Sequence, residues 1–127
     1  MERKSSIQQV ISSYERNNWG PHPHTPFARK LFLEIHKHFP CHLWREIRLY
    51  CSIGTPLDYW HGIDGFFELE KSIVTFDLTT LEDKDILKAD VLIPKSIFVD
   101  SSKLIAKAKE IATILKDRNN YNIILTR

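Results

Sequence analysis

Two aspartates, Asp64 and Asp77, stand on neighbouring strand-like segments in the middle of this chain of 127 residues. The segments are residues 62–69 and 73–79, and both alternate apolar with polar side chains, which is typical of β-strands with one buried face. Carboxylates held close together are the ligands that Mg²⁺ and Mn²⁺ prefer, and such ions assist the hydrolysis of phosphodiester bonds. The first question is therefore whether the fold brings these two acids together.

Hydrophobic burial selects the register of the predicted hairpin. Directly opposite residues of an antiparallel pair point to the same face, so the apolar sets share a face only if paired residue numbers have an odd sum. Asp64 opposite Asp77, across a two-residue turn at Glu70 and Lys71, satisfies this condition, whereas a slip of one residue would separate the two apolar sets. The apolar sets are Ile63, Phe67 and Leu69 on one segment and Val74, Phe76 and Leu78 on the other. We therefore expect Asp64, Asp77 and Thr79 to lie close together on the opposite face.

Two carboxylates at a Cβ separation of roughly 5 Å repel each other unless a cation lies between them. A divalent metal ion is one solution, because Mg²⁺ takes one or two protein carboxylates and completes its shell with water and phosphate oxygens. The alternative is that both acids lie at the rim of the sheet in water, with one of them paired to Arg45 or Arg48. The residues alone leave both interpretations open.

The elements that position these acids follow from the hydrophobic periodicity. Helices are expected from Ser5 or Ser6 to about Asn17, over residues 26–39 after a Thr25 cap, and over residues 102–118. Further strands are expected over residues 43–51, 89–93 and 121–125. The order α, α, β, β, β, β, α, β predicts an α/β fold, a mixed central sheet flanked by helices. We expect a single domain over residues 1–127, with residues 1–24 as an N-terminal helical extension.

The segment Gly62-Ile63-Asp64, followed by IVTFDLT at residues 73–79, resembles the PD-(D/E)xK or restriction-endonuclease-like nuclease superfamily. The resemblance implies a core of the order α-βββ-α-β, in which Asp64 is the acid of the second strand and Asp77 the acid of the third. It also implies a Mg²⁺ or Mn²⁺ cofactor, with Glu34 on the helix 26–39 as an additional metal-binding acid. The motif is short, and the resemblance covers the chain from Thr25 onward.

One position departs from the pattern of the superfamily. The motif lysine, which orients the attacking water and stabilises charge on the phosphate, is Thr79 here, and a neutral hydroxyl cannot supply that charge. Lys84 and Lys88 follow the motif and are candidates for a migrated lysine. Asp58 and His61 come shortly before Asp64 and are expected to line the same site as Asp64 and Asp77. His61 could serve there as a base near neutral pH.

The expected function is a divalent-metal-dependent nuclease that hydrolyses phosphodiester bonds, acting on DNA rather than RNA. The alternative is a catalytically inactive module of the same fold that binds nucleic acid or assembles with protein. Because a short nuclease often needs a second subunit to contact a duplex, a homodimer is expected.

Charge is distributed unevenly along the chain, although the net value is only +2. Residues 1–57 and 91–127 each carry a net +4, whereas residues 58–90, which include both aspartates, carry −6. This pattern suits a metal-binding acidic site between phosphate-contacting surfaces, and solvated charged faces produce it too. No apolar run reaches the roughly 18 residues of a membrane span and none resembles a signal peptide, so the expected location is the cytoplasm.

Two other groups of residues invite a functional interpretation. Five of the six histidines fall within residues 22–42, close to Cys41, but they lack the spacing of a zinc site, and surface histidines are the simpler interpretation. Trp19, Trp44 and Trp60 could stack on nucleic-acid bases if they are exposed, although burial is the more common fate of tryptophan.

Overall fold

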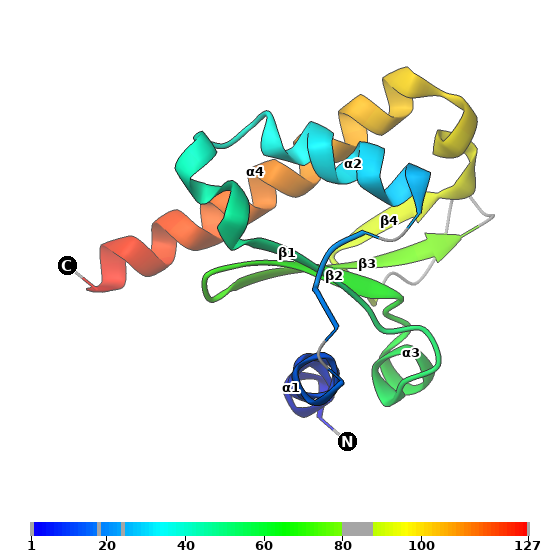
Figure 1. Cartoon of the computed structure of the whole chain (residues 1–127), viewed down its shortest axis with the longest axis vertical. Helices are drawn as coiled ribbons and strands as arrows, with labels where there is room; N and C mark the ends of the chain where they lie inside the picture. Colours follow the sequence, from blue (N-terminus) through cyan, green and yellow to red (C-terminus); the bar gives the residue numbers. More distant parts are fainter. Residues whose placement is uncertain (1, 18, 24, 80–87, 127) are drawn as a thin grey trace.

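A four-stranded mixed sheet forms the centre of the molecule, and helices cover both of its faces (Figure 1). The computed structural model describes residues 2–17, 19–23, 25–79 and 88–126. Its elements are α1 (Arg3–Arg16), α2 (Pro26–His36), η1 (Cys41–Glu46), β1 (Ile47–Cys51), α3 (Pro56–His61), β2 (Gly65–Leu69), β3 (Ser72–Thr79), β4 (Val91–Pro94), η2 (Lys95–Val99) and α4 (Ser101–Thr126). The predicted α/β class, with a mixed sheet flanked by helices, is confirmed.

The strands lie side by side in the order β1-β2-β3-β4. The first three form an antiparallel meander, and β4 runs parallel to β3. Gly65 pairs with Phe76 and Leu69 with Ser72, so paired residue numbers of β2 and β3 have the odd sum that hydrophobic burial predicts. Glu70, in the two-residue turn between them, has a φ of +57°, as a tight hairpin turn requires. The predicted register and turn are confirmed.

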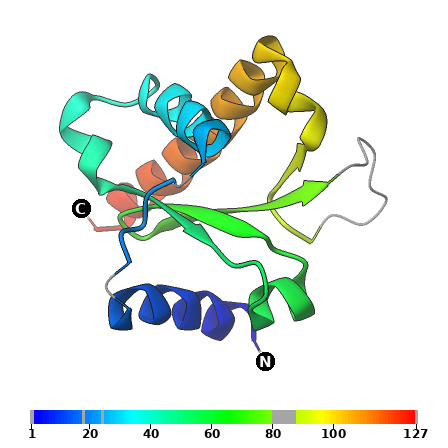
Figure 2. The same cartoon turned by 45° about the vertical axis from the view of Figure 1, so that its right-hand side comes forward.

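Helices lie against both faces of the sheet (Figure 2), and each face has its own apolar core. On one face α2 and α4 cover Phe67, Leu69, Val74 and Phe76, the side chains predicted to share a face. On the other face α1 and α3 cover Phe66 and Tyr50, together with Val10, Tyr14 and Leu57 from the helices. The face that carries the acids is therefore not open to water along its length, because two helices close most of it.

The chain between β1 and β2 differs from the prediction. A short helix, α3, occupies residues 56–61, for which no helix or strand was expected, and Gly62 ends it with a φ of +64°. The strand β2 consequently begins at Gly65 instead of residue 62. Ile63 precedes the strand and packs in the core of α1 and α3, so its predicted place beside Phe67 and Leu69 was wrong.

The C-terminal part of the chain also differs. Residues 121–125 were expected to form a strand, but the backbone of α4 remains helical from Ser101 to Thr126. The fourth place in the sheet is taken by β4, which pairs with β3 and thereby occupies the edge that a later strand would need. The helix therefore follows the fourth strand, and the predicted order of a helix and then a final strand was wrong.

Element boundaries move by a few residues elsewhere. The helix expected over residues 26–39 ends at His36, and residues 43–46 belong to a 3₁₀ turn that precedes β1. The first helix begins at Arg3, so neither Ser5 nor Ser6 caps it. Thr25 does cap α2 as predicted, accepting a 3.1 Å hydrogen bond from the N–H of Ala28. No helix within the described residues is both long and apolar enough to cross a membrane.

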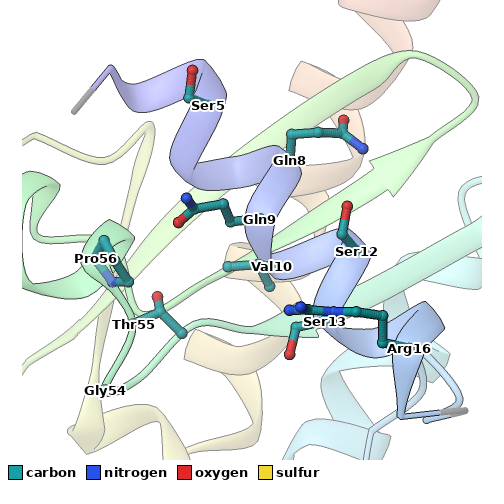
Figure 3. Close-up of a pocket in the computed structure, with 10 residues that line it drawn as sticks. All are labelled: Ser5, Gln8, Gln9, Val10, Ser12, Ser13, Arg16, Gly54, Thr55 and Pro56. Carbon is teal, nitrogen blue, oxygen red and sulfur yellow. The ribbon is translucent and has the colours of Figure 1, made fainter.

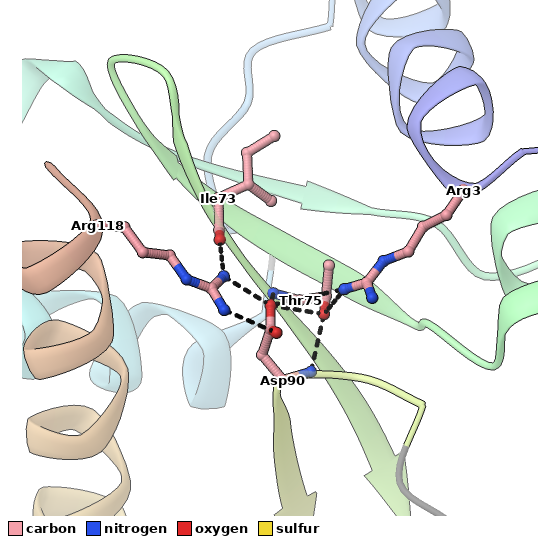
Figure 4. A network of polar contacts seen from close by, with 5 residues as sticks. All are labelled: Arg3, Ile73, Thr75, Asp90 and Arg118. Carbon is pink, nitrogen blue, oxygen red and sulfur yellow. Dashed lines mark hydrogen bonds and ion pairs between the residues drawn. The ribbon is translucent and has the colours of Figure 1, made fainter. Parts of the chain in front are cut away.

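A polar network joins the two terminal helices to the sheet (Figure 4). Arg118 of α4 donates two 2.9 Å hydrogen bonds to the carboxylate of Asp90, and a third to the carbonyl of Ile73. The same carboxylate accepts the N–H and hydroxyl of Thr75 in β3 at 2.9 and 3.0 Å. Arg3 of α1 donates to the Thr75 hydroxyl at 2.9 Å. The network fixes the start of β4 against β3.

Candidate functional site

Backbone hydrogen bonds hold Asp64 between α3 and β2. Its N–H donates to the carbonyl of Phe76 at 2.9 Å, and its carbonyl accepts the N–H of Ser52 at 2.8 Å. The Ser52 hydroxyl donates to the carbonyl of Ile63 at 2.7 Å and is fully buried. Gly65, directly after Asp64, leaves room for the Phe76 ring, because a Cβ there would lie 2.3 Å from the ring's Cζ. The position of Asp64 is thus fixed by its neighbours on both sides.

Asp77 lies near the end of β3, beside Asp64. The ladder of β2 and β3 ends at Gly65 and Phe76, and beyond it the carboxyls of Asp64 and Asp77 contact each other. The Asp77 side chain is 8% exposed, and Thr79, two residues further along the same strand, is 9% exposed. Residues two apart on a strand point to the same face, so Asp77 and Thr79 share the face of α1 and α3. Asp64 precedes β2 and also lines a cavity with Leu31 and Phe67 of the other core, so the common face of the three residues stays a prediction.

The carboxyl group of Asp64 is in an unfavourable place for a negative charge. Burial, with smaller contributions from the neighbouring carboxyls of Asp77 and Asp58, raises its pKa to about 6. A 2.8 Å hydrogen bond from the N–H of Leu78 to its Oδ2 acts in the opposite direction. Such a site gains from any ligand that brings positive charge, whether a proton or a metal ion.

Asp58 reaches this site from α3. Its Oδ2 accepts a 3.0 Å hydrogen bond from the N–H of Gly54, and its side chain contacts the carboxyl of Asp64. Gly54 has a φ of +83°, a conformation that glycine adopts without strain. The Gly54 turn therefore sets the direction of Asp58, and three aspartates from α3, β2 and β3 meet at one end of the sheet.

Lys88 and His61 lie next to Gly62, which separates α3 from Asp64. The aliphatic part of Lys88 passes over Gly62, with its Cδ 3.6 Å from the position that a Cβ would take there. Its side chain is exposed, whereas His61, the last residue of α3, is half-buried. The segment before β4 thus brings the stem of Lys88 against Gly62, two residues before Asp64.

The remaining predicted residues are not part of this group. Glu34 belongs to α2, on the other face of the sheet, where its carboxylate pairs with the ammonium of Lys37 at 2.7 Å. Lys84 lies outside the described residues. Arg48, one of the two arginines considered as an ion-pair partner for the aspartates, instead lies 3.9 Å from Glu68 on the neighbouring strand.

The histidines do not form a metal site in the part of the chain that the structure describes. There, no group of three or more His, Cys, Asp or Glu side chains has the arrangement of a complete metal-ligand set. His36 stacks on Trp44, with ring centroids 5.5 Å apart, and burial lowers its pKa. A metal at the aspartates would therefore depend on water or substrate oxygens for most of its ligands, as Mg²⁺ commonly does.

Sequence reasoning missed a groove along α1 whose lining combines polar and apolar groups (Figure 3). The groove has a volume of about 730 Å³ and lies between α1 and the turn of residues 54–56. Its α1 wall consists of Ser and Gln side chains together with Val10, and it ends at Arg16. The polar stripe of α1 was visible in the sequence, but only the packing of α1 against α3 turns it into a groove wall.

Comparison with protein-family models, with curated proteins and with solved structures finds no match to this chain. The geometry of the chain itself is therefore the basis for a functional proposal.

Proposed function

We propose that this chain is a divalent-metal-dependent nuclease of the restriction-endonuclease-like type, which hydrolyses phosphodiester bonds in DNA. The observation that carries the proposal is the contact between the carboxyls of Asp64 and Asp77 at one end of the hairpin, where burial, with a smaller contribution from the second acid, raises the pKa of Asp64 to about 6. Like-charged acids at a buried site cost stability, so their presence favours a role as ligands of a cation.

The donor set fits Mg²⁺ or Mn²⁺. Asp64 and Asp77 offer two carboxylates from rigid strands, and hard oxygen ligands are those that these ions prefer. When bound, the ion would supply a water of lowered pKa and positive charge against the phosphate. The chain's own contribution is to hold the two carboxylates in fixed directions through the backbone contacts of Asp64 and the strand pairing of β3.

The strand arrangement supports the family resemblance. An antiparallel meander with a fourth strand parallel to the third is the arrangement expected of a restriction-endonuclease-like core. The helix after β4, in place of a helix before it within the described residues, is a departure from that core. Thr79 in place of the motif lysine is a second departure.

Lys88 is our candidate for the missing lysine. Its position over Gly62, next to the acids, would let the ammonium approach a phosphate bound there. His61, at the end of α3, is a second group that could take a proton from water near neutral pH. Glu34 has no part in the proposal, because Lys37 pairs with it on α2.

The second candidate function is an inactive module of the same fold that binds DNA without cutting it. Thr79 favours this alternative, since a threonine hydroxyl provides no positive charge at the motif position. Both candidates imply nucleic acid as the partner, and we propose a cytoplasmic location and a homodimer for either of them.

A cleavage assay separates the two candidates. Fluorescently labelled DNA is incubated with Mg²⁺ or Mn²⁺ and with wild-type protein, Asp77→Ala, Lys88→Met or the control Glu34→Gln. We expect cleavage by wild type and Glu34→Gln, none by Asp77→Ala, and a loss of about tenfold or more for Lys88→Met. DNA binding without cleavage by wild type would support the inactive module, and cleavage by Asp77→Ala would contradict the proposed site.

A further inference from the structure

The groove of Figure 3 is suited to phosphates and sugars by its lining. Hydroxyl and amide side chains of α1 face it, namely Ser5, Gln8, Gln9, Ser12 and Ser13, and Arg16 lies at its end. These groups donate and accept hydrogen bonds without reading sequence, which is how many proteins contact a nucleic-acid backbone. No carboxylate is among the groove's lining residues in the described part of the chain.

The charge of α1 agrees with a polyanionic ligand. The helix Arg3–Arg16 carries three basic side chains and one acidic one, a net charge of +2. Arg3 is engaged with Asp90, so Arg16 is the basic side chain that the groove itself presents, whereas the site of the aspartates is acidic. A phosphodiester chain would be attracted along α1 and would meet the carboxylates only where a cation compensates them.

The groove and the acids share one structural element. Gly54, Thr55 and Pro56 form the second wall of the groove, and the N–H of Gly54 donates the 3.0 Å hydrogen bond that holds Asp58. Asp58 in turn contacts the carboxyl of Asp64. A nucleic-acid strand that lies in the groove is therefore directed toward the proposed cleavage site.

Two aromatic rings stand exposed on the same helix. Tyr59 and Trp60 follow Asp58 in α3 and are 81% and 69% exposed, although rings of this size are usually buried. Trp44, by contrast, uses its indole N–H to bond the carbonyls of His36 and Phe39, and it is only 43% exposed. Both lie about one helical turn after Pro56, which lines the groove, and exposed rings near a groove that could hold a nucleic-acid backbone are surfaces on which unpaired bases can stack.

We propose that the substrate is single-stranded DNA, whose backbone lies in the groove between α1 and residues 54–56 and whose bases stack on Tyr59 and Trp60. This inference rests on the proposed function and names its substrate class. Stacking requires bases whose faces are free, and in a duplex those faces are covered by neighbouring base pairs. A duplex also exposes only its backbone and groove edges, which leaves the two rings without a contact of their own.

Binding to labelled oligonucleotides tests the proposal. Fluorescence anisotropy measures a fluorescein-labelled 20-residue DNA single strand, its duplex, and an RNA of the same sequence, all in EDTA so that nothing is cut. The variants are Tyr59→Ala, Trp60→Ala and Arg16→Gln. Their controls are Leu33→Ala and Arg29→Gln, two exposed positions of α2 on the other face of the sheet. Circular dichroism verifies that each variant is folded.

We expect wild type to bind the DNA single strand at least about tenfold more tightly than the duplex. Loss of either ring should weaken single-strand binding by roughly fivefold to a hundredfold, the range typical of one stacked base. Arg16→Gln should reduce the slope of log affinity against log salt by about 0.7, the value for one phosphate contact on a single strand. Both control variants should bind as wild type does.

Three results would overturn the proposal. These are equal or tighter binding of the duplex, wild-type affinity in both ring variants, and tighter binding of RNA than of DNA. Because the assay contains no metal, its outcome is separate from that of the proposed nuclease. Binding of Mn²⁺ without binding of single strands would contradict this inference alone. Binding of single strands without binding of Mn²⁺ would contradict the catalytic proposal alone.

Discussion

Replacing Asp64 by Asn should stabilise the metal-free protein, because the native carboxylate is held where a charge is unfavourable. The pKa of Asp64 is raised from 3.8 to about 6, so the folded state binds a proton more tightly than the unfolded state does. Wild-type stability therefore falls as the pH rises from about 4 to about 6. Asn resembles the protonated form of Asp64, so the free energy of unfolding of Asp64→Asn does not fall over this pH range.

The size of the effect follows from the same pKa. Each pKa unit is worth about 1.4 kcal/mol, which gives a ceiling of about 3 kcal/mol above pH 6. Asp64 shares its site with Asp77, whose charge the substitution also relieves, so we expect a gain in the free energy of unfolding of about 1–3 kcal/mol. Below pH 4 the two proteins should be equally stable, since Asp64 is then protonated in both states.

Asp90→Asn provides a matched control with the opposite sign. Burial opposes the charge of Asp90, but hydrogen bonds from Arg118 and Thr75 outweigh it and lower the pKa to about 2. This stability is present above pH 4 and is lost as the pH falls toward 2. Because the Arg118 side chain is 44% exposed, solvent screening reduces the expected loss in Asp90→Asn at neutral pH to about 1–2 kcal/mol.

Urea denaturation in EDTA at pH 8, 6 and 4, followed by circular dichroism, measures both variants against wild type. We expect Asp64→Asn to exceed wild type at pH 8 and to approach it at pH 4, while Asp90→Asn is below wild type at pH 8. If Asp64→Asn were less stable than wild type at pH 8, the carboxylate would be a structural acceptor, and the argument for a site awaiting a cation would be refuted.

Three further substitutions test the fold that positions the site. Gly65→Ala should lower the free energy of unfolding by at least about 2 kcal/mol in urea denaturation, because its Cβ would meet the Phe76 ring at 2.3 Å; wild-type stability would contradict this contact. Thr25→Ala should cost about 1 kcal/mol by removing the cap of α2, and Thr25→Ser, which keeps the cap, should cost less. Tyr14→Phe should cost about 1 kcal/mol, because its hydroxyl accepts the N–H of Cys51 at 2.9 Å; faster hydrogen exchange at that amide is the expected signature.

The hairpin and its acids were predictable because their information is local. Alternation of apolar side chains fixes which face of each strand is buried, and burial then fixes the register, so the pairing of Gly65 with Phe76 and of Leu69 with Ser72 follows from a few residues. The mixed sheet with flanking helices followed from the same periodicity. These predictions depended on the pattern of apolar and polar side chains within short segments of the chain.

The errors arose where distant parts of the chain decide the outcome. Residues 121–125 have side chains suited to a strand, but β4 already occupies the free edge of β3, and the helix continues instead. Ile63 alternates correctly with Phe67, yet the left-handed Gly62 delays the start of β2 and turns Ile63 to the other core. Asp90 gave no signal in the sequence, because its partners Thr75 and Arg118 are 15 and 28 residues away.

The site likewise combines local and distant contributions. Asp58 was recognised as a neighbour in sequence, but its direction depends on the Gly54 turn, which the spacing of residues does not reveal. The groove beside α1 depends on the packing of two helices that are separated by about 40 positions in the chain. Its use by a single strand is accordingly an inference from the structure and not from the sequence.

Calorimetric titration with Mn²⁺ tests the central claim most directly. Wild-type protein at pH 7.5 is compared with Asp77→Ala and with Asp90→Asn, whose acid lies in the structural network away from the site. We predict that wild type and Asp90→Asn bind one Mn²⁺ each and that Asp77→Ala does not. Absence of binding by wild type, or binding that Asp77→Ala leaves unchanged, would contradict a metal site at Asp64 and Asp77.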